Sequence, residues 1–256
     1  MATTDGAATN SAAATPFNGN GHVVAASNAS GSPFAARLRA TRRWERLVGE
    51  SPAAVSLEAT VRRAAMVEST VLITGETGCG KEEIARAVHA HGPRADKPFV
   101  AVNCGAMAAT LIESQLFGHE KGSFTGAVGP SRGVFRAGER GIVFLDEIGE
   151  MPLDLQPRLL RVLQQREVTP VGSTDSFPVD VQVIAATNRD LTAEIREGRF
   201  REDLLYRLNT IELAVSPLRD RVADIPLFVD HFRQYFAEKF AVAPWEPDAS
   251  TLARFM

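Results

Sequence analysis

The sequence predicts an α/β fold in which a parallel β-sheet lies between two layers of helices. Short, nearly continuous runs of aliphatic residues alternate with stretches whose apolar residues recur at helical spacing. Buried parallel strands have this continuous apolar character, and helices are their usual crossovers. The 256 residues, 45% of them hydrophobic, are also enough to bury a sizeable core. These observations together favour a three-layer sandwich.

The expected elements follow in chain order. Helices are expected at Lys81–His91, where Ile84, Ala87 and Val88 share one face, and at Asp154–Gln165, which repeats leucines in the same way. The predicted strands are rich in Val, Ile, Leu and Ala and comprise Val71–Ile73, Phe99–Val102, Ile142–Leu145, Val181–Ala185 and Ile211–Leu213.

The chain divides into three parts. Residues 1–43 are rich in Ala, Ser, Thr, Asn and Gly, so we expect a disordered tail. Residues 44–216 hold the α/β core. In residues 217–256 the strand pattern stops, an amphipathic helix is expected at Asp224–Phe240, and a further helix begins near Thr251 without a stop signal before the chain ends.

Composition narrows the class of protein. The net charge of −3 gives no general attraction for nucleic acid, and two cysteines provide no disulfide framework. The N-terminus lacks the features of a signal peptide, and no apolar run is long enough to suggest a membrane span. A soluble cytoplasmic protein is therefore expected.

A glycine-rich loop follows the first predicted strand and opens the first crossover helix. Backbone N–H groups of such a loop point at phosphate oxygens, and a Lys at its end reaches the β- and γ-phosphates. A simple turn before a helix is the competing interpretation, but strand, loop, Lys and helix coincide. The loop and the following residue read Gly75-Glu76-Thr77-Gly78-Cys79-Gly80-Lys81-Glu82.

Glu82 departs from the general phosphate-loop motif. Ser or Thr usually stands in its place and supplies a hydroxyl to Mg²⁺. A carboxylate or a water would have to take over that role here.

Two adjacent carboxylates end the third predicted strand. Asp146 is expected to hold Mg²⁺, directly or through water, and Glu147 to orient the attacking water. A solvated loop or helix cap is the alternative, which the upstream phosphate loop disfavours. The sequence therefore predicts an ATPase with ATP and Mg²⁺ as cofactors.

A polar pair, Thr187 and Asn188, follows the fourth predicted strand. These residues could sense the γ-phosphate or position the attacking water. Equally, Asn188 or Asp190 could cap the helix expected from Leu191.

A second loop carries the sequence Gly122-Ser123-Phe124-Thr125-Gly126-Ala127. Its two glycines hold an aromatic at the tip of a flexible connection, which is unfavourable in water unless a partner covers it. A loop that folds back onto the domain is the alternative. The segment resembles the GAFTGA signature of bacterial sigma-54-dependent transcription activators, whose AAA+ domains use this loop to engage the sigma factor, although Ser123 replaces the signature's Ala.

The resemblance extends from about residue 47 to residue 240 and implies further roles. Val48 and Gly49 match the segment near the adenine, and Glu82 is usual at its position in this family. Asn103 matches the residue that holds the catalytic Glu in check; a turn-forming Asn is the plain alternative. Arg201 and Arg207 match the family's trans-acting arginines, which implies a ring, typically a hexamer; without the resemblance, ordinary surface ion pairs would be favoured.

The resemblance also bears on the rest of the chain. The segment 168–178 fits the family's second substrate-facing hairpin, or an ordinary connecting loop. Residues 217–256 match the start of a truncated α-helical lid, and no DNA-binding domain is visible. The implied activity is ATP-driven opening of promoter complexes formed by sigma-54 RNA polymerase holoenzyme. The alternative is a truncated module that binds nucleotide and the sigma factor without turnover.

Overall fold

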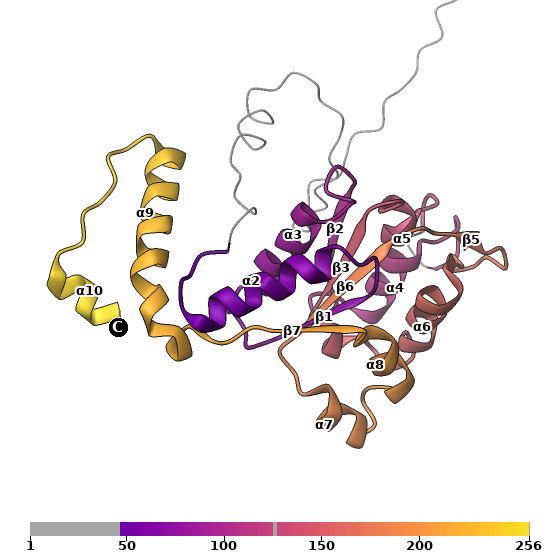
Figure 1. Cartoon of the computed structure of the whole chain (residues 1–256). Helices are drawn as coiled ribbons and strands as arrows, with labels where there is room; N and C mark the ends of the chain where they lie inside the picture. Colours follow the sequence, from indigo (N-terminus) through magenta and orange to yellow (C-terminus); the bar gives the residue numbers. More distant parts are fainter. Residues whose placement is uncertain (1–46, 125–126, 256) are drawn as a thin grey trace, which may run out of the picture.

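The computed structural model describes residues 47–124 and 127–255, and its centre is a five-stranded parallel sheet. The strand order is β2-β3-β6-β1-β7 (Figure 1). The strands comprise β1 (Val71–Thr74), β2 (Phe99–Asn103), β3 (Ile142–Asp146), β6 (Gln182–Thr187) and β7 (Ile211–Ala214). All five predicted strands are confirmed, and the parallel α/β class with them. The tail expected at residues 1–43 lies outside the described residues.

Four strands end one or two residues later than their apolar runs, each on a polar side chain. The register pairs Thr74 with Thr187 and Asn103 with Asp146. These polar residues are therefore part of the paired strands, so the backbone hydrogen bonds of the sheet fix their positions. This brings the candidate residues to one edge of the sheet, the carboxyl ends of its strands, where α/β proteins bind ligands.

Alternate residues of each central strand enter two separate apolar clusters, which defines the three layers. In β3, Ile142 and Phe144 pack with α2 (Pro52–Ala65) and α3 (Lys81–His91). Val143 and Leu145 pack into the larger cluster on the other face. That second face is covered mainly by α4 (Ala109–Phe117), α5 (Gly133–Ala137), α6 (Gln156–Gln165) and α8 (Glu202–Leu208).

Short elements connect these layers. The 3₁₀ turn η1 (Ile148–Glu150) follows β3, and α7 (Leu191–Arg196) follows β6. Between α6 and β6 the chain forms a small antiparallel hairpin of β4 (Glu167–Val168) and β5 (Phe177–Pro178). The segment 168–178 is therefore folded as a hairpin rather than as an irregular connection.

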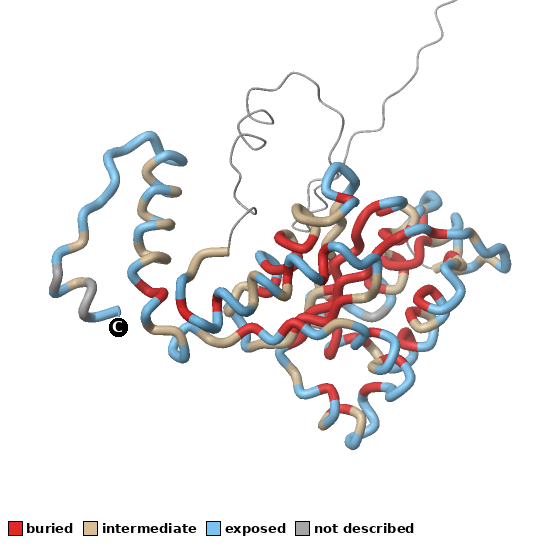
Figure 2. The backbone as a smooth tube through the Cα atoms, in the orientation of Figure 1, coloured by how far each residue is buried: buried red, intermediate tan, exposed pale blue. Residues whose placement is uncertain are grey.

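After β7 the chain leaves the sheet and is helical. The elements are η2 (Leu218–Asp224), α9 (Ile225–Phe240) and α10 (Ala249–Phe255), and α9 and α10 stand to one side of the sandwich (Figure 1). The predicted helices are present, but the apolar face of α9 is largely exposed (Figure 2). Phe232 and Phe236 are each 46% exposed. Within the described ranges, no helix is long and apolar enough to cross a membrane.

Candidate nucleotide-binding site

The glycine loop lies between the end of β1 and the start of α3, as predicted. A Cβ at Gly75 would lie 2.8 Å from both the Cys79 Sγ and the Val215 carbonyl oxygen, so only glycine fits this close approach. Gly80 precedes the helix with φ of 95° in the left-handed region. The backbone thus turns sharply into α3, whose first-turn N–H groups are directed back towards the loop.

Lys81 is the first residue of α3 and is only 9% exposed. Its Nζ donates hydrogen bonds of 2.9 Å to the carbonyl oxygens of Gly75 and Glu76. The ammonium therefore spans the loop rather than extending into solvent. Glu82, the next residue, pairs with Arg86 one helical turn later.

Asp146 and Glu147 stand at the end of β3. Burial is the main cause that raises the pKa of the Asp146 carboxyl; the Glu147 charge adds to it, whereas the Glu147 backbone N–H and the Lys81 charge oppose it. The Lys81 and Asp146 side chains are thus within electrostatic reach of each other. Glu147 adopts a left-handed conformation with φ of 53°, which is strained for a non-glycine residue and common at functional sites.

The Glu147 carboxylate lies against Gly105. A Cβ on Gly105 would be 2.8 Å from the Glu147 Oε2. The Gly105 backbone N–H in turn donates to the Asn103 Oδ1 at 2.8 Å. Asn103 and Glu147 are therefore brought to the same place, and the contact between them runs through Gly105.

Asn188 connects the end of β6 to the glycine loop. Its Nδ2 donates a 2.8 Å hydrogen bond to the Thr77 Oγ1. The helix-capping role that the sequence left open belongs to Asp190, which accepts N–H groups of Thr192 and Ala193. Thr187 is buried, and its Oγ1 accepts the backbone N–H of Arg189 at 3.0 Å.

The opening segment lies beside the loop. Val48 lines a small pocket of ≈ 130 Å³ together with Cys79, Gly80, Phe228 and Phe232. This mostly apolar slot adjoins the glycine loop through Cys79 and Gly80, and the adenine role of Val48 stays a prediction. It is walled on one side by the start of the domain and on the other by α9.

Asp224 fixes this arrangement from η2. Its fully buried carboxylate accepts the backbone N–H groups of Glu50 and Ser51, both at 2.8 Å, and the Ser51 hydroxyl at 2.7 Å. Burial tends to raise the pKa of Asp224, but these hydrogen bonds outweigh it and the pKa is lowered. Gly49 lies against the same carboxylate.

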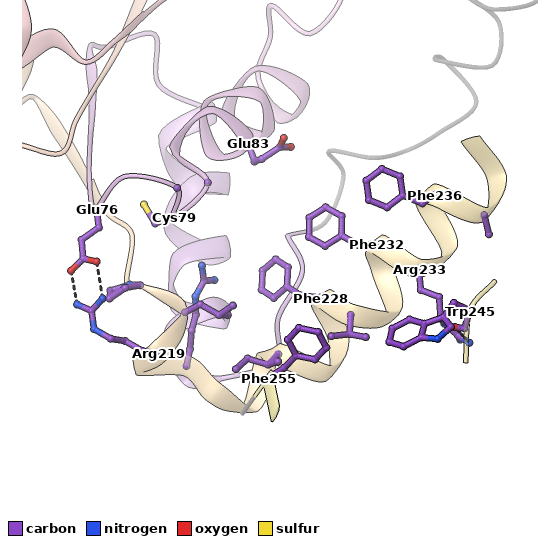
Figure 3. Close-up of a pocket in the computed structure, with 18 of the residues that line it drawn as sticks. Glu76, Cys79, Glu83, Arg219, Phe228, Phe232, Arg233, Phe236, Trp245 and Phe255 are labelled. Atoms are coloured by element: carbon purple, nitrogen blue, oxygen red, sulfur yellow. Dashed lines mark hydrogen bonds and ion pairs between the residues drawn. The ribbon is translucent and has the colours of Figure 1, made fainter. Parts of the chain in front are cut away.

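A larger cleft of ≈ 960 Å³ extends from the glycine loop along α9 (Figure 3). Phe228, Phe232 and Phe236 line it at successive turns, with ring centroids 6.4 Å apart. Arg219 of η2 closes one end through an ion pair with Glu76, with Nη1 2.7 Å from Oε2. This hydrogen bond is the main cause that lowers the pKa of Glu76.

Arg219 and Asp224 were missed by the sequence analysis. Each acts on a partner more than 140 residues away, and no local pattern distinguishes it from the other charges of η2. A charged cluster directly after the last strand is the only available signal.

The two predicted trans-acting arginines lie outside this cleft. Arg201 precedes α8, is 44% exposed and pairs with Asp203, with Nη2 2.7 Å from Oδ2. The Arg207 guanidinium donates to the Leu163 carbonyl on α6 at 3.2 Å. Neither arginine lines the pockets beside the glycine loop.

The signature loop packs on the β4–β5 hairpin region, and its described residues line neither pocket beside the glycine loop. Phe124 is half-buried and meets His119 edge to face at 5.0 Å between centroids. Ser123 contacts Gly172, and the Gly122 N–H donates to the Ala127 carbonyl at 2.9 Å. The aromatic thus packs partly against the domain. Thr125 and Gly126 lie outside the described residues.

A glycine loop that ends in a lysine follows β1. Two adjacent carboxylates stand at the end of β3, two strands away, and an Asn follows β6, the strand between β1 and β3. This arrangement defines a P-loop NTPase domain of the AAA+ type. Comparison with known proteins then specifies it further. The model of the sigma-54 interaction domain matches residues 47–214, and the chain belongs to this family of sigma-54-dependent activators.

Relatives and solved structures agree with this assignment. The chain is 54% identical to the DNA-binding transcriptional activator HyfR of Escherichia coli over 191 residues, 75% of this chain and 28% of HyfR. It is 50% identical to the regulatory protein AtoC of the same species over 202 residues, 79% of this chain and 44% of AtoC. It therefore spans less than half the length of these relatives.

Crystal structures of NtrX from Brucella abortus share the fold. The structure in complex with ADP has a TM-score of 0.78 at 36% identity, covering 87% of this chain and 48% of NtrX. The structure in complex with ATP has a TM-score of 0.76, covering 86% of this chain and 50% of NtrX.

Proposed function

We propose that this chain binds and hydrolyses ATP, and that it uses hydrolysis to act on sigma-54 RNA polymerase. The observation that carries the proposal is the convergence of Lys81, Thr77, Asn188, Asp146 and Glu147 at the carboxyl ends of three adjacent strands. They come from three segments, the glycine loop after β1, the end of β3 and the end of β6, and together they supply a phosphate cradle, a cation site and a base.

ATP binding is assigned to the glycine loop and the adjoining slot. N–H groups of Gly75–Glu82 bind the phosphates, with Lys81 exchanging its carbonyl partners for the β- and γ-phosphates. The adenine enters the slot between Val48 and the α9 aromatics. The NtrX structures with ADP and ATP support this assignment because they share the fold over most of this chain.

The residues present fit a Mg²⁺–nucleotide complex. Within the described part of the chain, no group of three or more His, Cys, Asp or Glu side chains forms a metal site. Mg²⁺ bound to a nucleotide needs only one or two carboxylates, because phosphates and waters complete its shell. Asp146 would supply that carboxylate, and the cation would neutralise charge on the transferred phosphoryl group. Glu82 is held by Arg86 and would act through water.

Hydrolysis is assigned to Glu147, and sensing of the γ-phosphate to Asn188 and Thr187. Glu147 accepts a proton from the attacking water and orients it. Asn188 contacts the loop through Thr77, so a γ-phosphate on the loop would alter this contact, and buried Thr187 fixes the turn. Asn103 holds Gly105 against the Glu147 carboxylate and thereby restrains it.

The arginine contribution is assigned to a second copy of the chain. Arg201 and Arg207 lie outside their own nucleotide cleft, and Arg201 is exposed. In a hexameric ring, each would reach the γ-phosphate of the neighbouring copy. Such an arginine is worth about three to five orders of magnitude in rate.

The signature loop is assigned to sigma-54 binding. Half-buried Phe124 packs on His119 and is available for release to a partner. Hydrolysis would then drive loop movement and promoter opening by the holoenzyme, in the cytoplasm.

ATPase rate against protein concentration tests the enzymatic part. We expect the rate per copy to rise with concentration and to collapse in Glu147→Gln and Arg201→Ala. Nucleotide binding without turnover at every concentration would instead leave a non-catalytic binding module.

Binding of purified sigma-54, measured with an ATP transition-state analogue present, tests the partner. Phe124→Ala should abolish binding, whereas Met66→Ala, which removes a 70% exposed apolar side chain directly after α2, should retain it. Equal binding by both variants would contradict the role of the loop.

A further inference from the structure

Gln156, the first residue of α6, is fully buried, and its side-chain amide bonds to three backbone groups. The Nε2 donates to the carbonyl oxygens of Met151 at 3.0 Å and Arg199 at 2.9 Å. The Oε1 accepts the backbone N–H of Arg201 at 2.9 Å. Because both donor hydrogens and the oxygen are used, the amide has one fixed orientation.

The three partners belong to two segments that serve different roles in the proposed mechanism. Met151 directly follows η1, the turn that begins after Glu147. Arg199 and Arg201 precede α8, which packs beside α6 (Figure 1). One buried amide therefore connects the turn after the catalytic carboxylate to Arg201, the exposed arginine directly before α8.

A chain of ion pairs joins the same two segments by a separate route. Arg189 pairs with Glu150 of η1 and, at 3.1 Å, with Glu194 of α7. Glu194 is 8% exposed and also accepts the Arg199 Nε at 2.7 Å and Nη2 at 2.8 Å. Two independent sets of polar contacts thus hold the residues before α8 in place.

The Arg201 side chain has no comparable anchor within the described residues. Its guanidinium pairs with Asp203 on its own helix at the surface, an exposed pair that constrains it little. The position of Arg201 relative to the domain is therefore set by its backbone, and the bond to Gln156 is the polar contact made directly by that backbone N–H.

We propose that Gln156 is a positioning residue that holds Arg201 where its side chain reaches the nucleotide of a neighbouring copy. The inference rests on the proposed function, since it requires a ring with an active site shared between copies. Gln156 touches no reacting atom. Its loss should impair the arginine that a copy donates, and should leave the nucleotide cleft of that copy competent.

Mixed assemblies test this directionally. A copy with Glu147→Gln has a dead cleft but donates Arg201, whereas a copy with Arg201→Ala has a competent cleft and donates nothing. Gln156→Met, nearly equal in volume, should behave like Arg201→Ala. Without a second variant present, Gln156→Met should have turnover lower by about tenfold or more, which is part of the three to five orders of magnitude that an arginine finger contributes. It should keep wild-type affinity for a fluorescent ATP analogue.

The pairing decides the matter. Mixed with Glu147→Gln, the Gln156→Met protein should regain turnover, as the Arg201→Ala protein does in the same mixture. Mixed with Arg201→Ala, it should regain none. Turnover that is regained with Arg201→Ala but not with Glu147→Gln would overturn the inference. Wild-type turnover by Gln156→Met alone would also overturn it.

Controls separate the possible failures. If Glu147→Gln and Arg201→Ala do not restore each other, the shared active site of the proposed function fails, whatever Gln156 does. Gln164→Met makes the same change at an exposed position of α6 and should match the wild type. If Gln156→Met fails to bind nucleotide, Gln156→Glu is tested in its place. The ionised Glu side chain lacks both donor contacts, and the same results are expected in the two mixtures.

Discussion

Replacing Asp224 with Ala should weaken both the domain and its nucleotide site. The fully buried carboxylate holds the opening segment to η2 through three hydrogen bonds of 2.7–2.8 Å from Glu50 and Ser51. Ser51 also caps α2 by accepting the Ala54 N–H. Removal of the carboxylate therefore leaves two backbone donors and a hydroxyl to find other partners.

The magnitude follows from those bonds. A hydrogen bond to a charged group contributes about 1.5–3 kcal/mol, and water can replace the one at exposed Glu50. Two such bonds, those from Ser51, are not restored by water, so we expect a loss of about 3–6 kcal/mol in the free energy of unfolding. For a domain of this size the corresponding fall in Tm is about 6–24 °C.

Two assays check this prediction: thermal unfolding, and binding of a fluorescent ATP analogue. Binding should weaken because Val48, which lies two residues before the anchored Glu50, forms one wall of the adenine slot. Asp220→Ala is the matched control, since Asp220 lies exposed in the same η2. A Tm within about 2 °C of the wild type, less than 1 kcal/mol for this size, together with unchanged binding would refute the reasoning.

Three further outcomes are expected. Lys81→Ala should abolish ATP-analogue binding, and retained binding in a fluorescence titration would contradict the assignment of the loop. Asn188→Ala, which removes the bond to Thr77, should lower turnover by about 10–100-fold with little change in ATP affinity, as steady-state rates and titrations would reveal. The hydrogen bond from Arg199 is the main cause that lowers the pKa of Glu194 from 4.5 to about 2. Folding therefore favours the ionised carboxylate. The stability that the ionised carboxylate contributes is present above about pH 4.5 and is lost as the pH falls towards 2. Glu194→Gln should flatten the fall in Tm over that interval, and an unchanged pH profile would contradict the role of the pair.

Much of the fold was predictable because its signals are local. Each strand is a run of buried aliphatic residues, and the glycine loop with Lys81 is a contiguous motif whose chemistry needs that spacing. The paired carboxylates were identifiable once the loop was recognised. Local sequence did not decide whether Asn188 or Asp190 caps α7, since both have the required side chain; the structure gives the cap to Asp190.

What could not be predicted depends on contacts between distant segments. Asp224 meets Ser51 across 173 positions, and Arg219 meets Glu76 across 143. In the sequence, Gln156 is one polar residue near the start of a predicted helix. Its contacts with Arg199 and Arg201 become visible only when α8 packs beside α6. The helical spacing of apolar residues predicted α9 correctly. That spacing does not show whether another element covers the apolar face of the helix, and in the structure Phe232 and Phe236 are half-exposed.

The central claim is that one active site is formed by two copies of the chain. The most direct test is the ATPase rate of an equimolar mixture of Glu147→Gln and Arg201→Ala proteins, each inactive alone. The account predicts that turnover reappears on mixing, because a competent cleft then meets a donated arginine. A mixture that stays as inactive as its components, although both variants bind ATP and assemble, would contradict it.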